Sequence, residues 1–277
     1  MVSRPQNRRE SELSLGRLGN LEVKIALSEE EVAHAQRVRY QVFYEEMSAA
    51  ADAAVRASGR DSDAFDAAAD HLLIVDRDAA GPAGPTVVGT SRLIRQDVAA
   101  AEHGFYSAGE FDVGRMLTRN PGRRFLELGR SCVLKPYRDK RAAELMWHGI
   151  WRYFRAHALD VMIGCGSLEG TDVERLAPLL SLLRTLSPAP DSWRVAANAG
   201  TGISLDELAL THPPDKAALR ALPPLIKGYL RLGAYVCEEA VVDRQFGTTD
   251  VFLVLPLEAI NARYIKYYGE EADRYAA

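Results

Sequence analysis

The spacing of apolar residues divides the chain into short stretches with the period of a strand and longer stretches with the period of a helix. Short runs that are wholly apolar, or that alternate apolar and polar residues, predict strands. Two of these runs flank a turn rich in Gly and Pro at residues 81–85, so we expect them to pair as a hairpin. The expected strands are residues 21–26, 71–76, 86–95, 124–134, 161–165 and 250–256.

A period near 3.6 marks the expected helices. Ser28 followed by Glu31 has the spacing of a capping box, which predicts a helix start at this point. The clearest amphipathic pattern runs from Ala142 to His157, where apolar residues recur on one face and predict burial along it. The expected helices are residues 28–47, 142–157, 171–184 and 257–268.

The order of these elements is typical of the α/β fold of the GNAT acetyltransferase superfamily, in which helices flank a central, mixed and mostly antiparallel sheet. Residues 49–69 and 188–215 carry no clear period, and we expect them to be largely irregular. No repeat or linker interrupts the pattern, which favours a single domain over residues 21–277. Residues 1–20 are rich in Arg and Ser and lack the apolar core of a secretory signal, so we interpret them as a flexible tail.

Composition excludes several classes of function. The formal net charge of -4 over 277 residues gives no basic field for nucleic acid. The three cysteines, Cys132, Cys165 and Cys237, form no C-x-x-C pair, and the histidines form no cluster, so we expect no metal site and a reducing compartment. No apolar run is long enough to span a membrane. We therefore expect a cytoplasmic protein, with peripheral contact to the inner membrane as an open alternative.

A glycine-free turn between the fourth expected strand and the second expected helix carries a dense group of basic residues. The spacing of Val133, Arg138, Arg141 and Ala142 matches the GNAT phosphate loop, where the strand backbone binds a pantetheine arm and the helix N-terminus binds phosphate. The alternative interpretation is a solvated, charged turn without a ligand. The predicted donor-binding residues are Ser131, Cys132, Val133, Arg138, Lys140 and Arg141.

Charged residues also lie inside expected strands, where they are costly unless paired. Arg92 is surrounded by apolar residues in its strand, which predicts a carboxylate partner in a cleft, although a purely structural ion-pair network is the alternative. Glu127 and Arg130 are three residues apart and would face opposite sides of a regular strand. Both reach one site only if the strand bulges, and Gly129 is the natural place for a bulge.

Several motifs, taken together, resemble the autoinducer-synthase branch of the GNAT fold. They are RYQVF at residues 39–43, DAFDAAADHL at 63–72, VGTSRL at 88–93 and ELGR at 127–130. Within that branch, LELGRSCVLKPYRD, GCGSLEGTD and PPLIKGYLRLGAYVCEEAVVDRQFGTTDVFLVLP are similar to the bacterial L-ornithine N-acyltransferases of ornithine-lipid synthesis. The family's characteristic positions correspond to Arg39, Phe43, Asp63, Asp66, Arg92, Glu127 and Arg130.

The resemblance implies transfer of a 3-hydroxyacyl chain from acyl carrier protein to the α-amine of L-ornithine, which gives lyso-ornithine lipid. The phosphopantetheine arm belongs to the donor, so no separate cofactor is implied. A carrier protein brings one phosphate and an acidic surface, which suits the basic turn better than coenzyme A does. The alternatives on the same fold are another amino-acid acceptor or an acyl-homoserine-lactone type of synthase.

Roles for the individual residues follow from the chemistry of an activated thioester. Glu127 is expected to act as general base through a water, and a backbone N–H near residues 131–133 to stabilise the oxyanion. Arg92 or Arg130 would bind the ornithine carboxylate. Asp63 or Asp66 would bind its second amine, unless these acids only order their loop. Residues 222–232 either line the acyl pocket or lie at a membrane surface.

Overall fold

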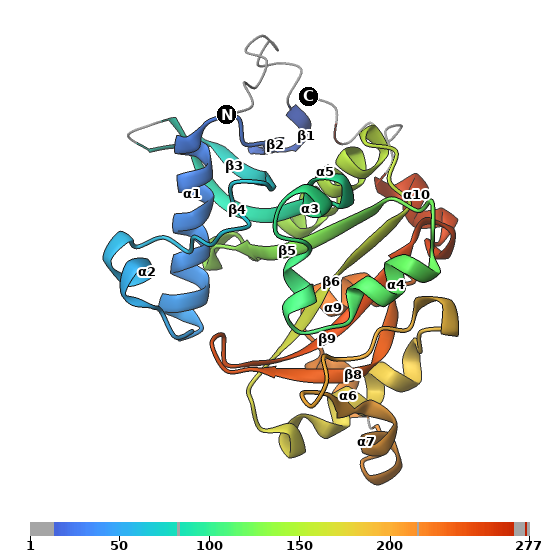
Figure 1. The fold of residues 1–277 in the computed structure, drawn as a ribbon. Helices are drawn as coiled ribbons and strands as arrows, with labels where there is room; N and C mark the ends of the chain where they lie inside the picture. Colours follow the sequence, from blue (N-terminus) through green and yellow to red (C-terminus); the bar gives the residue numbers. More distant parts are fainter. Residues whose placement is uncertain (1–13, 82–83, 215, 269–274, 276–277) are drawn as a thin grey trace.

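The computed structural model describes residues 14–81, 84–214, 216–268 and 275. The strands in this part of the chain are β1 (Ser14–Leu18), β2 (Leu21–Ile25), β3 (Asp70–Gly81), β4 (Gly84–Arg95), β5 (Phe125–Val133), β6 (Val161–Glu169), β7 (Ile203–Ser204), β8 (Tyr235–Asp243) and β9 (Thr248–Pro256). They form one sheet in the order β1-β2-β3-β4-β5-β6-β9-β8-β7 (Figure 1). Neighbouring strands are antiparallel except β5 and β6, which are parallel. The predicted mixed, mostly antiparallel sheet is confirmed.

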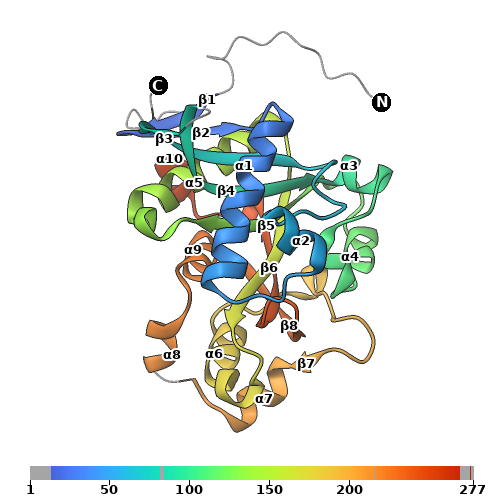
Figure 2. The same ribbon diagram turned by 90° about the vertical axis from the view of Figure 1, so that its left-hand side faces the viewer.

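The helices connect the strands and cover both faces of the sheet. The α-helices are α1 (Glu29–Tyr40), α2 (Ala53–Ser58), α3 (Gln96–Ala101), α4 (Val113–Arg119), α5 (Lys140–Ala156), α6 (Val173–Leu186), α7 (Leu205–Thr211), α8 (Lys216–Ala221), α9 (Pro224–Leu232) and α10 (Ala262–Tyr268). The other helical turns are η2 (Gln41–Glu46), η3 (Tyr106–Gly109), η4 (Lys135–Tyr137), η5 (Asp191–Trp193) and η6 (Leu257–Ala259). Figure 2 shows α1 lying across β3, β4 and β5. None of the described helices is both long and apolar enough to cross a membrane.

Two layers of helices are separated by the sheet because alternate strand residues face opposite sides. Leu72 and Ile74 of β3 are buried in one core with the apolar face of α5. The intervening Leu73 and Val75 are buried in a second core with α1. The first core also contains apolar residues of α6 and α9, and a third core beneath α4 contains alternate residues of β6, β8 and β9. The α5 and α9 side of the sheet is therefore distinct from the α1, η3 and α4 side.

The sheet opens into a V between the parallel strands β5 and β6. These strands pair only from Phe125 to Glu127 on β5, opposite residues 161–163 on β6. Gly164 lies at the point where they part, and a Cβ atom there would lie 2.4 Å from the carbonyl oxygen of Leu128. Beyond this point β5 pairs with β4 alone and β6 with β9 alone. Each strand therefore has a free edge along the V.

The sequence predicted most of these elements and missed several. The helix expected at residues 28–47 is α1 followed by η2, and Ser28 accepts a hydrogen bond from the Glu31 N–H as its N-cap. The expected tail at residues 1–20 is wrong at its end, because Ser14–Leu18 form β1 and pair with β2. The first 13 residues of that tail lie outside the described part. The expected loop at 188–215 contains β7 and α7, and β8 was not predicted.

Candidate active site

A cleft of about 320 Å³ occupies the V between β5 and β6. Its walls are the free edge of β5, from Glu127 to Val133, and Cys165 and Ser167 of β6. On the α9 side the lining is apolar and includes Leu225, Ile226 and Tyr229. On the α1 side it includes Phe43, Tyr106, Arg130, Asp243, Phe246 and Asp250. The cleft thus joins an apolar half to a polar, charged half across the sheet.

The predicted bulge in β5 is present, one residue later than expected. Arg92 pairs with Gly129 and Thr90 with Cys132, so β5 has one more residue than β4 between these two pairs. Arg130 takes up the difference with a φ of 51°, in the left-handed region. This conformation costs a non-glycine residue about 1–2 kcal/mol. The bulge turns Arg130 into the cleft beside Glu127, as the spacing of the two charges required.

The contacts of Arg130 stabilise this strained conformation. Its guanidinium lies over the rings of Tyr106 and Phe246, 4.5 Å from each centroid. It also forms ion pairs with Asp61 at 3.2 Å and with Asp63 at 3.4 Å. Burial alone would lower the pKa of Arg130, but the nearby Tyr106 and the two carboxylates raise it. Arg130 is therefore a permanent cation at the edge of the cleft.

Behind Arg130 lies a buried ion-pair network of three arginines and three aspartates. Arg39, which is 0% exposed, binds Asp61 at 2.7 Å and both oxygens of Asp66, at 2.9 and 2.7 Å. Arg92 binds Asp63 at 2.6 Å and Asp66 at 3.1 Å. Burial would raise the pKa of Asp66, but hydrogen bonds from Arg39 and the two guanidinium charges lower it well below its usual range. We name Arg39, Arg92, Arg130, Asp61, Asp63 and Asp66 the Arg–Asp network.

Glu127 lies at the apex of the V and is 2% exposed. Its two carboxylate oxygens accept hydrogen bonds from the backbone N–H groups of Tyr106 at 2.7 Å and Ser107 at 2.8 Å. Burial raises the pKa of the Glu127 carboxyl against these hydrogen bonds, which lower it. Glu127 therefore fixes η3 over the cleft and so holds the Tyr106 ring against Arg130.

The start of α5 already holds an anion from the chain itself. Asp139 is the N-cap and accepts hydrogen bonds from the N–H groups of Arg141 and Ala142. Arg141 turns back to pair with Asp139 at 3.0 Å, and it does not line the cleft. Arg138 does line the cleft, donates to the Val133 carbonyl at 2.8 Å and pairs with Glu46 at 2.5 Å. Only part of the basic turn is therefore directed toward the V.

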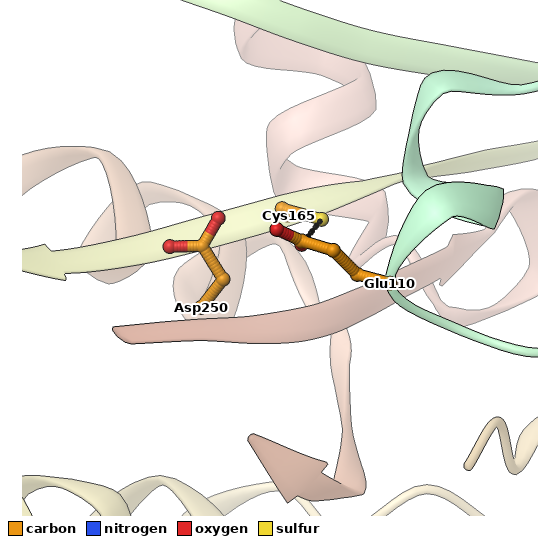
Figure 3. A group of neighbouring side chains, drawn as sticks. All are labelled: Glu110, Cys165 and Asp250. Atoms are coloured by element: carbon orange, nitrogen blue, oxygen red, sulfur yellow. Dashed lines mark hydrogen bonds between the residues drawn. The ribbon is translucent and has the colours of Figure 1, made fainter. Parts of the chain in front are cut away.

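Three further acidic residues lie at the polar half of the cleft: Asp243 and Asp250 line it, and Glu110 lies beside Asp250 without lining it. Asp250 lies on β9 opposite Ser167, Asp243 lies at the end of β8, and Glu110 follows η3. Figure 3 shows the carboxylates of Glu110 and Asp250 directed toward one another next to Cys165, whose thiol donates to Glu110 at 3.7 Å. Burial and the neighbouring carboxylates raise the pKa of Glu110 to about 7. Burial, and more weakly Asp243, raise the pKa of Asp250 to about 6.

We name Glu110, Asp243 and Asp250 the acidic triad. Asp250 accepts a hydrogen bond from the Thr248 hydroxyl at 2.8 Å. Asp243 accepts the N–H groups of Gln245 at 2.8 Å and of Phe246 at 3.0 Å. No residue of the triad has an ion-pair partner in the described part of the chain.

The structure brings about half of the predicted site residues to the cleft. Those that line it are Phe43, Glu127, Arg130, Ser131, Cys132, Val133 and Arg138. Those that do not are Arg39, Asp63, Asp66, Arg92, Lys140 and Arg141.

Sequence reasoning missed Asp61 and the acidic triad. Asp61 lies only two residues before Asp63, and that spacing was the available signal. Asp250 carried a signal as well, as an acidic residue directly before the apolar run 251–256.

Comparison with known proteins places the chain in a family. The Acetyltransferase (GNAT) domain model matches residues 38–148. An L-ornithine N(alpha)-acyltransferase from Rhizobium meliloti (strain 1021) is 49% identical, over 95% of this chain and 89% of the relative. Proteins of the same name from Agrobacterium fabrum (strain C58 / ATCC 33970) and Brucella abortus (strain 2308) are each 46% identical, over 98% and 94% of this chain and 92% and 93% of the relative.

Two solved structures are similar to this chain at low sequence identity and with TM-scores below 0.5. FeeM, an N-acyl amino acid synthase from uncultured soil microbes, is 11% identical with a TM-score of 0.47, over 86% of this chain and 91% of that one. The AHL synthase LasI is 12% identical with a TM-score of 0.44, over 86% and 90%. The match to the GNAT domain model agrees with the predicted GNAT fold. Given its identity to curated relatives over nearly its whole length, the chain belongs to the L-ornithine N(alpha)-acyltransferase family.

Proposed function

We propose that this protein transfers a 3-hydroxyacyl chain from acyl carrier protein to the α-amine of L-ornithine. The observation that carries the proposal is 46–49% identity to L-ornithine N(alpha)-acyltransferases over nearly the whole chain. The cleft supports it, because its apolar half suits an acyl chain and its charged half suits an amino acid. The product of such a transfer is lyso-ornithine lipid.

The donor would enter along the free edge of β5. The backbone of residues 131–133 lies on this edge and offers hydrogen-bonding groups to the amides of a pantetheine arm. The acyl chain would extend toward Leu225, Ile226 and Tyr229 of α9. Ile226 and Tyr229 are buried, which supports the pocket interpretation of this segment over the membrane-surface interpretation.

The basic turn supports a carrier protein as the donor. Since Asp139 caps α5, a phosphate has to be bound mainly by side chains, of which Arg138 lines the cleft. One phosphate on a pantetheine arm suits such a site better than the pyrophosphate of coenzyme A. The exposed Lys140 beside it would attract the acidic surface of a carrier protein, whereas Arg141 is already paired with Asp139.

The chemistry needs no covalent enzyme intermediate, because a thioester is already activated. The neutral α-amine attacks the carbonyl carbon, the C–N bond forms, and the C–S bond then breaks. The amine loses one proton and the departing thiolate gains one. A backbone N–H in the bulge, near Ser131, would stabilise the oxyanion. We propose that Glu127 accepts the amine proton through a water, since its two hydrogen bonds leave lone pairs free.

The test is a product assay with purified protein, 3-hydroxyacyl carrier protein and a panel of amino acids, scored by mass. We expect N-acylornithine, and we expect no product from Nα-acetylornithine, in which the reactive amine is blocked. Glu127→Gln should slow the reaction by about 10²–10⁴-fold. Glu258 is a surface carboxylate that pairs with Arg123, so Glu258→Gln is the matched control and should retain full activity. Acylation of another amine with none of ornithine would refute the proposal.

A further inference from the structure

Asp243 and Asp250 line a part of the cleft that the transfer chemistry does not use, and the Glu110 carboxylate lies within 4.8 Å of that of Asp250. Given the function proposed above, we propose that Glu110, Asp243 and Asp250 bind the side-chain ammonium of the acceptor and so select a dibasic amino acid. A carboxylate cluster that binds only this group would set acceptor specificity without taking part in bond formation.

The Arg–Asp network and the acidic triad differ in charge balance. Each aspartate of the Arg–Asp network pairs with at least one arginine, and the network is neutral overall. The triad carries three carboxyl groups and has no ion-pair partner in the described part of the chain. Arg130, the cation that lowers the pKa values of Glu110 and Asp250, is committed to Asp61 and Asp63. Buried carboxylates normally pair with a cation, so this half of the cleft lacks a positive charge.

The unbalanced negative charge lies at the cleft, because Asp250 is buried and lines it. Asp250 is only 6% exposed, and it faces the cleft rather than bulk solvent. Its hydrogen-bond partners, Thr248 and Ser167, are neutral hydroxyls. An acid on a central strand, more than nine-tenths buried and with only neutral partners, is costly to ionise. A ligand ammonium that enters the cleft would remove that cost.

The raised pKa values of Glu110 and Asp250 agree with this interpretation. The groups that face them are Asp243 of β8, Cys165 of β6 and Arg130 of β5. Burial has the largest effect and raises both pKa values, the carboxylates raise them further, and Arg130 lowers them. In the free protein a proton thus compensates part of the negative charge, and an ammonium would replace it.

The V places the acidic triad at a distance from the reacting atoms that the side chain of an amino acid can span. Glu127 pairs with Ile163, and Cys165 is two residues farther along β6, about 7 Å away. Ser167 follows, directly opposite Asp250. An amino acid whose α-amine lies near Glu127 would therefore extend its side chain along β6 toward the triad. Gly166 faces α9 instead, since a Cβ atom there would lie 3.3 Å from Ile226, so the acyl chain and the side chain occupy opposite sides.

A divalent metal ion is the competing occupant. Ligand atoms of Glu110, Cys165 and Asp250 lie within 4.8 Å of one another. Burial and the neighbouring carboxylates raise the pKa of the Cys165 thiol well above its ordinary value, so the thiol keeps its proton and is a poor ligand. Two carboxylates and a protonated thiol suit an ammonium better than a metal ion.

The experiment compares ornithine with norvaline, which has the same carbon chain but lacks the δ-amine. For the wild-type protein we expect kcat/KM to favour ornithine by at least about 10²-fold. Asp250→Asn should lower kcat/KM for ornithine by about 30- to 1000-fold and leave norvaline within about threefold. Glu110→Gln should act in the same direction. Glu258→Gln is the matched control, and circular dichroism with thermal unfolding checks that each variant is folded.

The outcomes separate this proposal from the function on which it rests. Wild-type protein that acylates other amines but not ornithine refutes the function and, with it, the proposal. If ornithine is acylated but the ornithine-to-norvaline ratio survives both substitutions, only the proposal is refuted. An equal loss with both substrates would assign the triad to the chemical step or to folding. Inactivation by a chelator with recovery on adding Zn²⁺ or Mg²⁺ would assign it to a metal.

Discussion

The stability of the fold near the cleft should depend strongly on Asp66. Each of its two oxygens accepts an N–H group of Arg39, at 2.9 and 2.7 Å, and Arg92 and Gln36 donate to it at 3.1 and 3.0 Å. In Asp66→Asn one oxygen becomes an NH₂ group. In either orientation of the amide, this NH₂ faces a guanidinium N–H, so at least one donor is left unsatisfied. The charge of the carboxylate is lost as well, which leaves the network with an excess of one positive charge.

The expected magnitude follows from the burial of the network. Removing one partner of a buried ion pair costs about 3–5 kcal/mol. With a urea m-value of about 3 kcal/mol/M, the unfolding midpoint should fall by about 1–1.7 M. Asp97→Asn is the matched control: Asp97 also pairs with an arginine, but its side chain is 73% exposed. A surface pair of this kind contributes at most about 1 kcal/mol, so its midpoint should move by less than about 0.3 M.

The difference in unfolding midpoint between wild type and Asp66→Asn should also depend on pH, which provides a second measurement. The pKa of Asp66 is lowered in the folded protein, so its contribution to stability is present above the unfolded pKa of about 4. That contribution is lost as the pH falls through the lower, folded value. The gap between wild type and Asp66→Asn should therefore be constant from pH 5 to 8 and narrow in acid. Tryptophan fluorescence during urea unfolding measures the midpoint of each protein at each pH. A midpoint for Asp66→Asn within 0.3 M of wild type, or a difference between the two proteins that widens in acid, would refute the reasoning.

Three further predictions concern the donor and the acceptor. Arg138→Glu should raise the KM for the acyl carrier about tenfold, because Arg138 lines the cleft, whereas Arg141→Glu should have a much smaller effect; equal KM values would contradict this. Ile226→Trp should shift the preferred acyl chain to shorter lengths in a competition assay, with a loss of about fourfold in kcat/KM for each methylene excluded. The KM for ornithine should fall as the pH rises through about 6 to 7, because Asp250 and Glu110 must lose their protons to bind an ammonium, and Asp250→Asn should flatten that profile.

The pattern of apolar residues predicted the centre of the fold well and its edges poorly. The hairpin of β3 and β4 was evident because two apolar runs flank a turn rich in Gly and Pro, and α5 was evident because it buries one face against the sheet and so shows a clear period. β1 was missed because it is an edge strand of only five residues, in which apolar and polar residues do not alternate. β8 was hidden within an apolar stretch that changes from helix to strand at Gly233, whose φ of 110° ends α9.

The site was predictable where its residues lie on one strand. The spacing of Glu127 and Arg130 required a bulge, and the bulge is present because Arg130 adopts a left-handed conformation. Asp250 could not be assigned in this way. Its position depends on the pairing of β6 with β9, which lie about eighty residues apart in the sequence, and no local pattern encodes that register.

The two groups of acids at the cleft also differ in how available they are to the ammonium of an acceptor. Asp63 and Asp66 were obvious candidates because they lie in a recognisable motif, but arginines of the same motif set already neutralise them. A carboxylate that is already paired gains little from a second cation, whereas an unpaired buried one gains the full interaction. Charge balance, which only the folded arrangement reveals, therefore distinguishes acids that stabilise the fold from acids that are available to a ligand. On that criterion Asp66 belongs to the first kind and Asp250 to the second.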